Sequence, residues 1–178
     1  MERLSDSDHP LVRQTALRLT EASLEVRDKL LKLFLYGHDG IAFRAPENGD
    51  YVKASETIRL GYGQCNTKAT LSLALCTAIG LPTRILFSLI KRNIQKGYFT
   101  GIAYWLMLRE TSRSWIEVEI DGQWRRIDSF INALALYEAA QTELKRRRWS
   151  TGFSLALSDE EVPQTSTWTG RCTSRSPL

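Results

Sequence analysis

Residues 113–128 carry the pattern that most limits the fold of this chain. Apolar and polar residues alternate over 113–120 and again over 123–128, and Asp121-Gly122 separates the two runs. Asp-Gly between alternating runs is the strongest short-range signal for a tight β-hairpin turn. The sequence therefore predicts two antiparallel strands joined by a turn at these two residues.

A second pattern predicts a buried helix that begins at a cysteine. The run Gly61-Tyr62-Gly63-Gln64-Cys65 precedes an apolar stretch over 66–79, with Gly80 and Pro82 at its end. A thiol on the first turn of a helix meets the positive end of the helix dipole and unpaired backbone N–H groups, which favour the thiolate. The glycines leave amide donors free, so an oxyanion site could form beside the sulfur. The alternative is that Cys65 is a small core residue, because free cysteines are commonly buried.

Taken in order, these motifs resemble those of the transglutaminase-like superfamily of papain-fold cysteine enzymes. That family shows a G-x-C helix start, then H-A-W-V-E-V, a turn and G-x-W-x-x-x-D, whereas 113–118 read R-S-W-I-E-V and 122–128 read G-Q-W-R-R-I-D. Three motifs in the right order are far more specific than any one of them. The resemblance covers roughly residues 30–130, and the matching residues are Cys65, Trp115, Glu117, Trp124 and Asp128.

The resemblance implies a fold and a set of roles. The fold is α+β and papain/transglutaminase-like, with N-terminal helices and a central helix carrying Cys65 packed on an antiparallel sheet. Cys65 is then the nucleophile, and Asp128 orients the catalytic base. Gln64 and Trp115 are candidates for oxyanion or substrate contacts.

Arg113 stands where the family has its catalytic histidine. Arginine keeps its proton at physiological pH, so it can neither accept the thiol proton nor protonate a leaving amine. A guanidinium could still lower the pKa of the Cys65 thiol and pair with Asp128. Such a Cys-Arg-Asp site would exchange acyl groups between good leaving groups, such as thioesters, and would cut amides poorly.

The chain offers only two histidines as a substitute base. His9 precedes Pro10, and a helix cap or a surface position is expected there. His38 falls at the end of a predicted helix, where the dipole favours a positive imidazole. In the family this stretch resembles V-R-D-x-I, with a structural arginine at the matching residue. His38 is therefore the alternative base, although a lone histidine is more often a cap or a surface group.

Length and composition predict a single domain over residues 1–162, followed by a loosely ordered tail over 163–178 that is rich in Ser and Thr. No run approaches about 18 apolar residues, which disfavours a membrane span. The odd count of three cysteines, without metal-ligand spacing, disfavours a disulfide framework and a zinc site and favours a reducing cytoplasm. No metal or cofactor is expected. Cys76 is expected in the core, and Cys172 lies in the tail.

Periodicity predicts the remaining elements. Residues 10–34 read as one helix or two, broken near 20–23 and capped by Asp8. Residues 44–54 read as a loop, 83–90 and 101–108 as strands, 91–97 as a polar connection and 133–149 as a helix.

The net charge is +4, and residues 145–149, K-R-R-R-W, form the densest basic run. Such a run is usually a solvated helix face, and nucleic-acid binding is disfavoured because acidic residues are nearly as numerous and no nucleic-acid module is visible. A basic surface could instead receive an anionic substrate or the acidic face of a carrier protein. A small molecule, a peptide or a carrier-bound acyl group is the expected partner.

Two functions remain open from the sequence. The first is an acyltransferase or amide hydrolase that acts through a thioester on Cys65. The second is a repurposed scaffold that binds an anionic small molecule or peptide in the old cleft, with Arg113 as the anion contact. The retained cysteine favours the first function, and the lost histidine favours the second.

Overall fold

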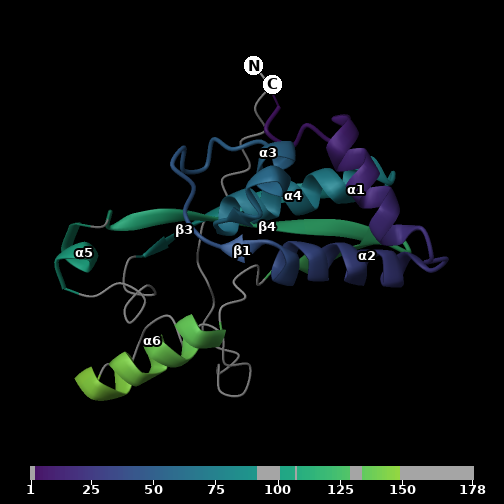
Figure 1. The fold of residues 1–178 in the computed structure, drawn as a ribbon. Coiled ribbons are helices and arrows are strands. Elements are labelled where there is room, and N and C mark those ends of the chain that lie inside the picture. Colours follow the sequence, from purple (N-terminus) through teal and green to yellow (C-terminus); the bar gives the residue numbers. More distant parts are fainter. Residues whose placement is uncertain (1–2, 92–100, 107, 129–133, 149–178) are drawn as a thin grey trace. The chain divides into compact units, whose positions relative to one another are not determined.

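The computed structural model describes residues 3–91, 101–106, 108–128 and 134–148 (Figure 1). The chain divides into two compact units. The first comprises Met1–Phe87 and Ser114–Asn132, and the second comprises Ser88–Arg113 and Ala133–Leu178.

The described elements follow in chain order. The helices are α1 (Pro10–Thr20), α2 (Val26–Leu35), the wide helical turn η1 (Tyr36–Gly40), α3 (Ala54–Leu60), α4 (Cys65–Ala78), α5 (Gly101–Leu106) and α6 (Leu134–Arg147). The strands are β1 (Ala42–Phe43), β2 (Tyr62–Gly63), β3 (Thr83–Lys91), β4 (Glu110–Ile120) and β5 (Gln123–Ile127).

Helix α4 lies at the centre of the first unit, and the prediction of a buried helix is confirmed. Ala69, Leu71, Ala74 and Leu75 on this helix are fully buried. Gly80 has φ +78°, the left-handed conformation that commonly ends a helix. The helix is therefore fixed by burial along most of its length, so the position of its first residue is well defined.

The predicted hairpin is also confirmed. Strands β4 and β5 pair antiparallel with Ile120 opposite Gln123, and the turn residues Asp121 and Gly122 both have positive φ, 53° and 71°. This is the backbone of a tight hairpin turn that matches the twist of the strands. Strand β4 is the middle strand of a three-stranded sheet in the order β3-β4-β5.

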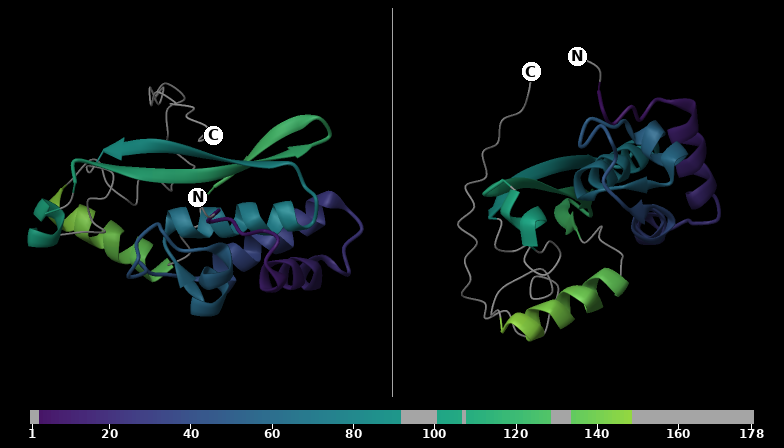
Figure 2. Two further views of the ribbon diagram at one scale, coloured as in Figure 1. Left: turned by 90° about the horizontal axis from the view of Figure 1, so that it is seen from above. Right: turned by 60° about the vertical axis from the view of Figure 1, so that its left-hand side comes forward.

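One face of the hairpin packs against the helices of the first unit. Ile116 and Val118 of β4 are buried in one apolar cluster with residues of α1, α2 and α4. Figure 2 shows these helices gathered on one side of the hairpin strands. The architecture is therefore an α+β arrangement of N-terminal helices and a central helix on an antiparallel sheet, as expected.

The N-terminal segment forms two helices, α1 and α2, and residues 21–25 separate them, which overlaps the break expected near 20–23. The expected cap, Asp8, was wrong. His9 is the N-cap, because its Nδ1 atom accepts the free backbone N–H of Leu11 at 3.1 Å. The cap role considered for His9 is thus confirmed, and Pro10 occupies the first helical position.

The prediction of a strand over 101–108 was wrong, because residues 101–106 form α5. A short apolar run has too few residues for its period to distinguish a strand from a helix. Here the run contains Ala103 and Leu106, which favour a helix, and Gly101 has φ +60°. The predicted strand over 83–90 is confirmed as β3, and the predicted loop after Phe43 lasts until α3 begins at Ala54.

In the second unit, the predicted helix over 133–149 is confirmed as α6. Glu143 forms ion pairs with Arg146 and Arg147, and hydrogen bonds from these two side chains lower the pKa of Glu143 to about 2. These pairs within one helix agree with a solvated basic face.

Several predictions fall outside the described residues. These are the tail over 163–178 with Cys172, most of the polar connection over 91–97, and the boundary of the single domain at 162, which stays a prediction. No helix among the described residues is long and apolar enough to span a bilayer.

Candidate active site

Cys65 is the first residue of α4 and is half-buried. The preceding residue, Gln64, is the N-cap. The side chain of Thr67 accepts the backbone N–H of Gln64 at 2.9 Å and donates to the Gln64 carbonyl at 3.1 Å. This local pairing fixes the backbone on both sides of Cys65 and holds the thiol at the positive end of the helix.

A parallel pairing of β1 with β2 holds the segment that leads to Cys65. Ala42 pairs with Tyr62 and Phe43 with Gly63, and the backbone N–H of Arg44 donates to the Gly63 carbonyl at 3.0 Å. Gly63 is needed here because a Cβ atom at this position would lie 2.5 Å from Thr67 Oγ1. The glycine therefore allows the close approach between β2 and the first turn of α4.

The carboxylate of Asp50 bridges the two neighbours of Cys65. Gln64 Nε2 donates to Oδ1 of Asp50, and Asn66 Nδ2 donates to Oδ2 at 2.7 Å. Asn66 Oδ1 in turn accepts Ser114 Oγ of β4 at 2.9 Å and lies 3.8 Å from Cys65 Sγ. The loop, the helix start and the sheet thus meet through one polar network around Cys65.

Lys68, one turn after Cys65, is fully buried. Its Nζ atom donates to the carbonyl oxygens of Ile41 at 2.7 Å and His38 at 3.1 Å. Burial lowers the pKa of Lys68 to about 8, and the nearby charge of Asp39 opposes this effect.

Two arginines, Arg84 and Arg126, contact the family-motif residues on and next to the hairpin. Arg84 donates to Glu117 at 2.6 Å and stacks 4.2 Å from the ring centre of Trp124. Glu117 of β4 is also the register partner of Arg126 on β5.

Arg126 also connects the other two motif residues. It donates to Asp128 at 2.6 Å and stacks 4.3 Å from the ring centre of Trp115. Asp128 follows β5, and its side chain is only 18% exposed. The carboxylate that the resemblance assigns to orienting a base is thus ion-paired with a guanidinium.

Arg113 lies on β4 in the second unit, immediately before Ser114, whereas Cys65 and Asp128 lie in the first unit. A contact between Arg113 and either residue therefore stays a prediction.

The other candidate residues have these surroundings. The side-chain amide of Gln64 donates a hydrogen bond to Asp50. Trp115 is 8% exposed. Its indole Nε1 atom is buried and has no hydrogen-bond partner among the described residues. The ring of His38 hydrogen-bonds Asp39 at 2.6 Å and stacks on Phe34. The oxyanion or substrate role of Gln64 and Trp115 and the base role of His38 stay predictions.

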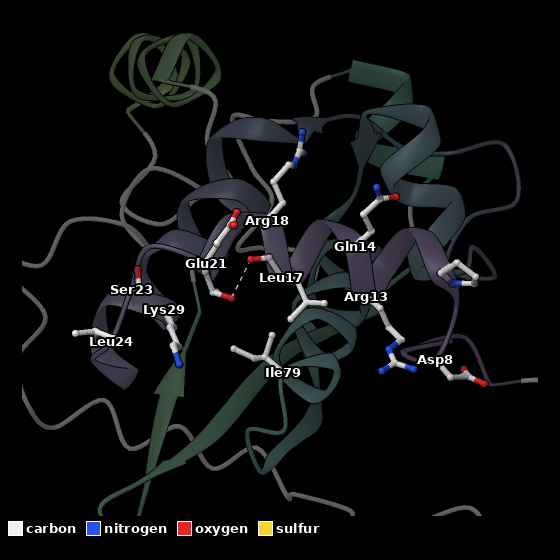
Figure 3. Close-up of a pocket in the computed structure, with 12 residues that line it drawn as sticks. Asp8, Arg13, Gln14, Leu17, Arg18, Glu21, Ser23, Leu24, Lys29 and Ile79 are labelled. Atoms are coloured by element: carbon white, nitrogen blue, oxygen red, sulfur yellow. Dashed lines mark hydrogen bonds between the residues drawn. The ribbon is translucent and has the colours of Figure 1, made fainter.

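A large cavity of the first unit lies away from Cys65. Its volume is about 1040 Å³, and Figure 3 shows Leu17 of α1 and Ile79 facing each other in it. Ile79 follows the last residue of α4. Because a 14-residue helix is about 20 Å long, the cavity and the thiol belong to opposite ends of α4.

Sequence reasoning missed Asp50, Asn66, Lys68 and Ser114. Asp50 and Ser114 are brought to the helix start by the fold, and nothing in their local sequence indicates this contact. Lys68 carried a usable signal, because a lysine within an apolar helical stretch is rarely buried without partners. A search of that stretch for charged residues could have found it.

The fold and this site define a class of protein. A half-buried cysteine begins a central helix that packs on an antiparallel sheet, and an ion-paired aspartate follows the hairpin. A profile of the transglutaminase-like superfamily matches residues 13–129, more than half of the 178-residue chain. The chain therefore belongs to the transglutaminase-like superfamily, and the expected papain/transglutaminase-like fold is confirmed.

Solved structures share this fold. One is named as a candidate cysteine protease from Cytophaga hutchinsonii; it is 20% identical with a TM-score of 0.55, over 71% of this chain and 38% of that chain. Another is named as a candidate protease from Parabacteroides distasonis; it is 16% identical with a TM-score of 0.52, over 71% of this chain and 24% of that chain. This chain thus spans well under two thirds of either protein. Comparison with curated proteins gave no match.

Proposed function

We propose that this protein is a cysteine-dependent acyltransferase or hydrolase that forms a thioester on Cys65. The observation that carries the proposal is the position of Cys65, half-buried and first on α4. The positive end of the helix dipole favours a thiolate there. Membership in the transglutaminase-like superfamily supports the same chemistry. Asp128 and Arg113 are assigned to this site by the family motif.

The proposed cycle consists of two acyl transfers. The Cys65 thiolate attacks the acyl carbon, a C–S bond forms, and the bond to the leaving group breaks with its electron pair. A thiolate leaving group departs as an anion, whereas an amine must be protonated first. Water, an amine or a thiol then takes the acyl group, releases its proton to solvent and restores Cys65.

The arginine at position 113 narrows the substrate class. A guanidinium cannot protonate a leaving amine, so thioesters are favoured over amides. The net charge of +4 further favours an anionic acyl donor, such as an acyl thioester bound to an acidic carrier protein.

The test compares an acyl thioester with the arylamide of the same acyl group. We expect the thioester to be consumed and an intermediate with the acyl mass to appear on the peptide containing Cys65. The arylamide should remain intact, and Cys65→Ala should process neither compound. Thioester turnover that survives Cys65→Ala would contradict the proposal.

The second candidate function is a binding scaffold, and it is favoured by the arginine that replaces the family histidine. In that case a small carboxylate ligand should bind with equal affinity to the native protein and to Cys65→Ala. Binding should fall by tenfold or more in Arg113→Ala, because a charge-assisted contact is lost. Isothermal titration calorimetry with the three proteins separates the two functions.

A further inference from the structure

Lys68 is the buried charged group that the proposed reaction does not use. Its side chain is fully buried, and its Nζ atom donates to two backbone carbonyls, those of His38 and Ile41. Lysine is almost never fully buried, because removing an ammonium from water is costly even when hydrogen bonds are made. A place where a fold tolerates such a cost often serves function rather than stability.

The two carbonyls bonded by Lys68 lie in the chain segment that positions Cys65. Ile41 immediately precedes β1, which pairs with β2, and β2 ends two residues before Cys65. Gly63 of β2 also approaches Lys68, since a Cβ atom there would lie 3.3 Å from Lys68 Cγ. The Lys68 side chain thus joins η1 and the residue before β1 to the first turn of α4 through its ammonium, and its stem lies beside β2.

Lys68 is also a near neighbour of Cys65 on the helix. Residues three apart share a helix face with Cβ atoms about 5–6 Å apart. Helical side chains lean toward the helix N-terminus, which brings the lysine stem toward the end of the helix that carries Cys65.

We propose that Lys68 is a positioning residue for Cys65: its buried ammonium fixes the β1–β2 pairing beside the helix start and stabilises the Cys65 thiolate by its charge. The inference rests on the proposed function of Cys65 as the nucleophile. Lys68 does not contact the substrate and acts through the thiolate. The protein thereby has a second cation for the thiol in addition to the one predicted at Arg113.

Lys68 can stabilise the Cys65 thiolate by its charge only at pH values where Lys68 is protonated. Its pKa of about 8 keeps it mainly protonated at neutral pH. Asp39 of η1 is the group whose charge raises the pKa of Lys68. The other titratable groups on η1, β2 and α4 and directly after β1 are Tyr36, His38, Tyr62, Arg44, Cys65 and Cys76.

The test measures the rate of Cys65 alkylation by iodoacetamide from pH 5 to 10, with peptide mapping to assign the label. Lys68→Met keeps the length and apolar stem of the side chain but removes the charge and both hydrogen bonds. We expect the rate at pH 7 to fall about tenfold and the midpoint of the profile to rise by about one pH unit. Lys32→Met, an exposed lysine of α2, is the matched control and should leave the profile unchanged.

A second variant keeps the inference testable if Lys68→Met does not fold. Asp39→Asn retains Lys68 and both carbonyl contacts but removes the carboxylate that favours the ammonium. The rate at pH 8 should fall at least threefold while the rate at pH 6.5 stays unchanged, because Lys68 then loses its proton at lower pH. The direct effect of removing a negative charge near a thiolate would have the opposite sign.

The outcomes distinguish this inference from the proposed function. Alkylation profiles of folded Lys68→Met or of Asp39→Asn that match the native protein would overturn the role of Lys68, whatever the turnover. Slow native alkylation that shows no midpoint below pH 9 would instead count against Cys65 as the nucleophile, and the role of Lys68 would fall with it.

Discussion

At the scale of single residues, the site that we propose has the cysteine and the aspartate of the family motif, with Arg113 at the position of the motif's histidine. The cysteine begins α4, and the aspartate is ion-paired with Arg126. In the proposed site, arginine in place of histidine removes the group that would move protons and leaves groups that stabilise charge. The chemistry of the site should therefore depend on the leaving group more strongly than in a Cys-His-Asp enzyme.

Arg113→His tests this conclusion by restoring the missing base. An imidazole at position 113 can take the thiol proton and protonate a leaving amine. We expect arylamide hydrolysis to rise by about 10²–10⁴-fold over the native protein, measured as released arylamine. The gain must disappear in the double variant with Cys65→Ala. Unchanged amide hydrolysis would mean that position 113 does not reach Cys65.

At the scale of elements, the start of α4 is held by two strands of only two residues each, β1 and β2. Such short strands contribute few hydrogen bonds, so their pairing depends on the side chains packed around them. Thr67 and Lys68 supply this packing, and Gly63 leaves the room for it.

Gly63→Ala should disturb this element specifically. Its methyl group would lie 2.5 Å from Thr67 Oγ1, closer than real contacts allow, so the first turn of α4 must shift. We expect a loss of about 1–3 kcal/mol in the free energy of unfolding, measured with urea, together with slower alkylation of Cys65.

Gly49→Ala is the control for this prediction. Gly49 has φ +58°, but a methyl group added there would meet no atom within 4 Å, so this variant should lose stability through backbone strain alone. Its Cys65 alkylation rate should stay unchanged. Equal slowing of alkylation in both variants would show that the effect is general destabilisation.

The sequence predicts elements here better than it predicts the contacts between them. Helix α4 and the β4–β5 hairpin follow from period and turn residues, which are local signals. The strand expected over 101–108 failed because a short apolar run fits both periods. The bridge from Asp50 to Gln64 and Asn66 could not be predicted, because it joins residues 14 and 16 positions apart. Helix α3 and strand β2 lie between them in the chain, and their packing decides which residues meet.

At the scale of the whole molecule, two buried titratable groups on α4 connect stability to pH. Burial lowers the pKa of Lys68 from 10.5 to about 8 and raises the pKa of Cys76 from 9.0 to about 12. The expected core position of Cys76 is confirmed, since it is 2% exposed. The two groups act on stability in opposite directions at alkaline pH.

The contribution of Lys68 can be isolated by comparison with Lys68→Met. Between about pH 8 and 10.5 the unfolded chain holds a proton on Lys68 that the folded chain has released. Stability from this group therefore rises with pH across that window, by roughly 3 kcal/mol. Urea unfolding at several pH values should show the native protein gaining this amount relative to Lys68→Met. Parallel curves for the two proteins would contradict it.

Cys65 and Cys76 lie near opposite ends of α4, so their labelling rates can report local opening of the first unit. Cys65 is half-buried, whereas Cys76 lies three turns along the same helix inside the core, and burial keeps its pKa near 12. When peptide mapping assigns each label and sets Cys172 apart, a thiol-specific reagent therefore reports two separate events, access to the helix start and exposure of the core. The ratio of the labelling rates of Cys65 and Cys76 measures how often the core opens relative to the helix start, without any engineered cysteine.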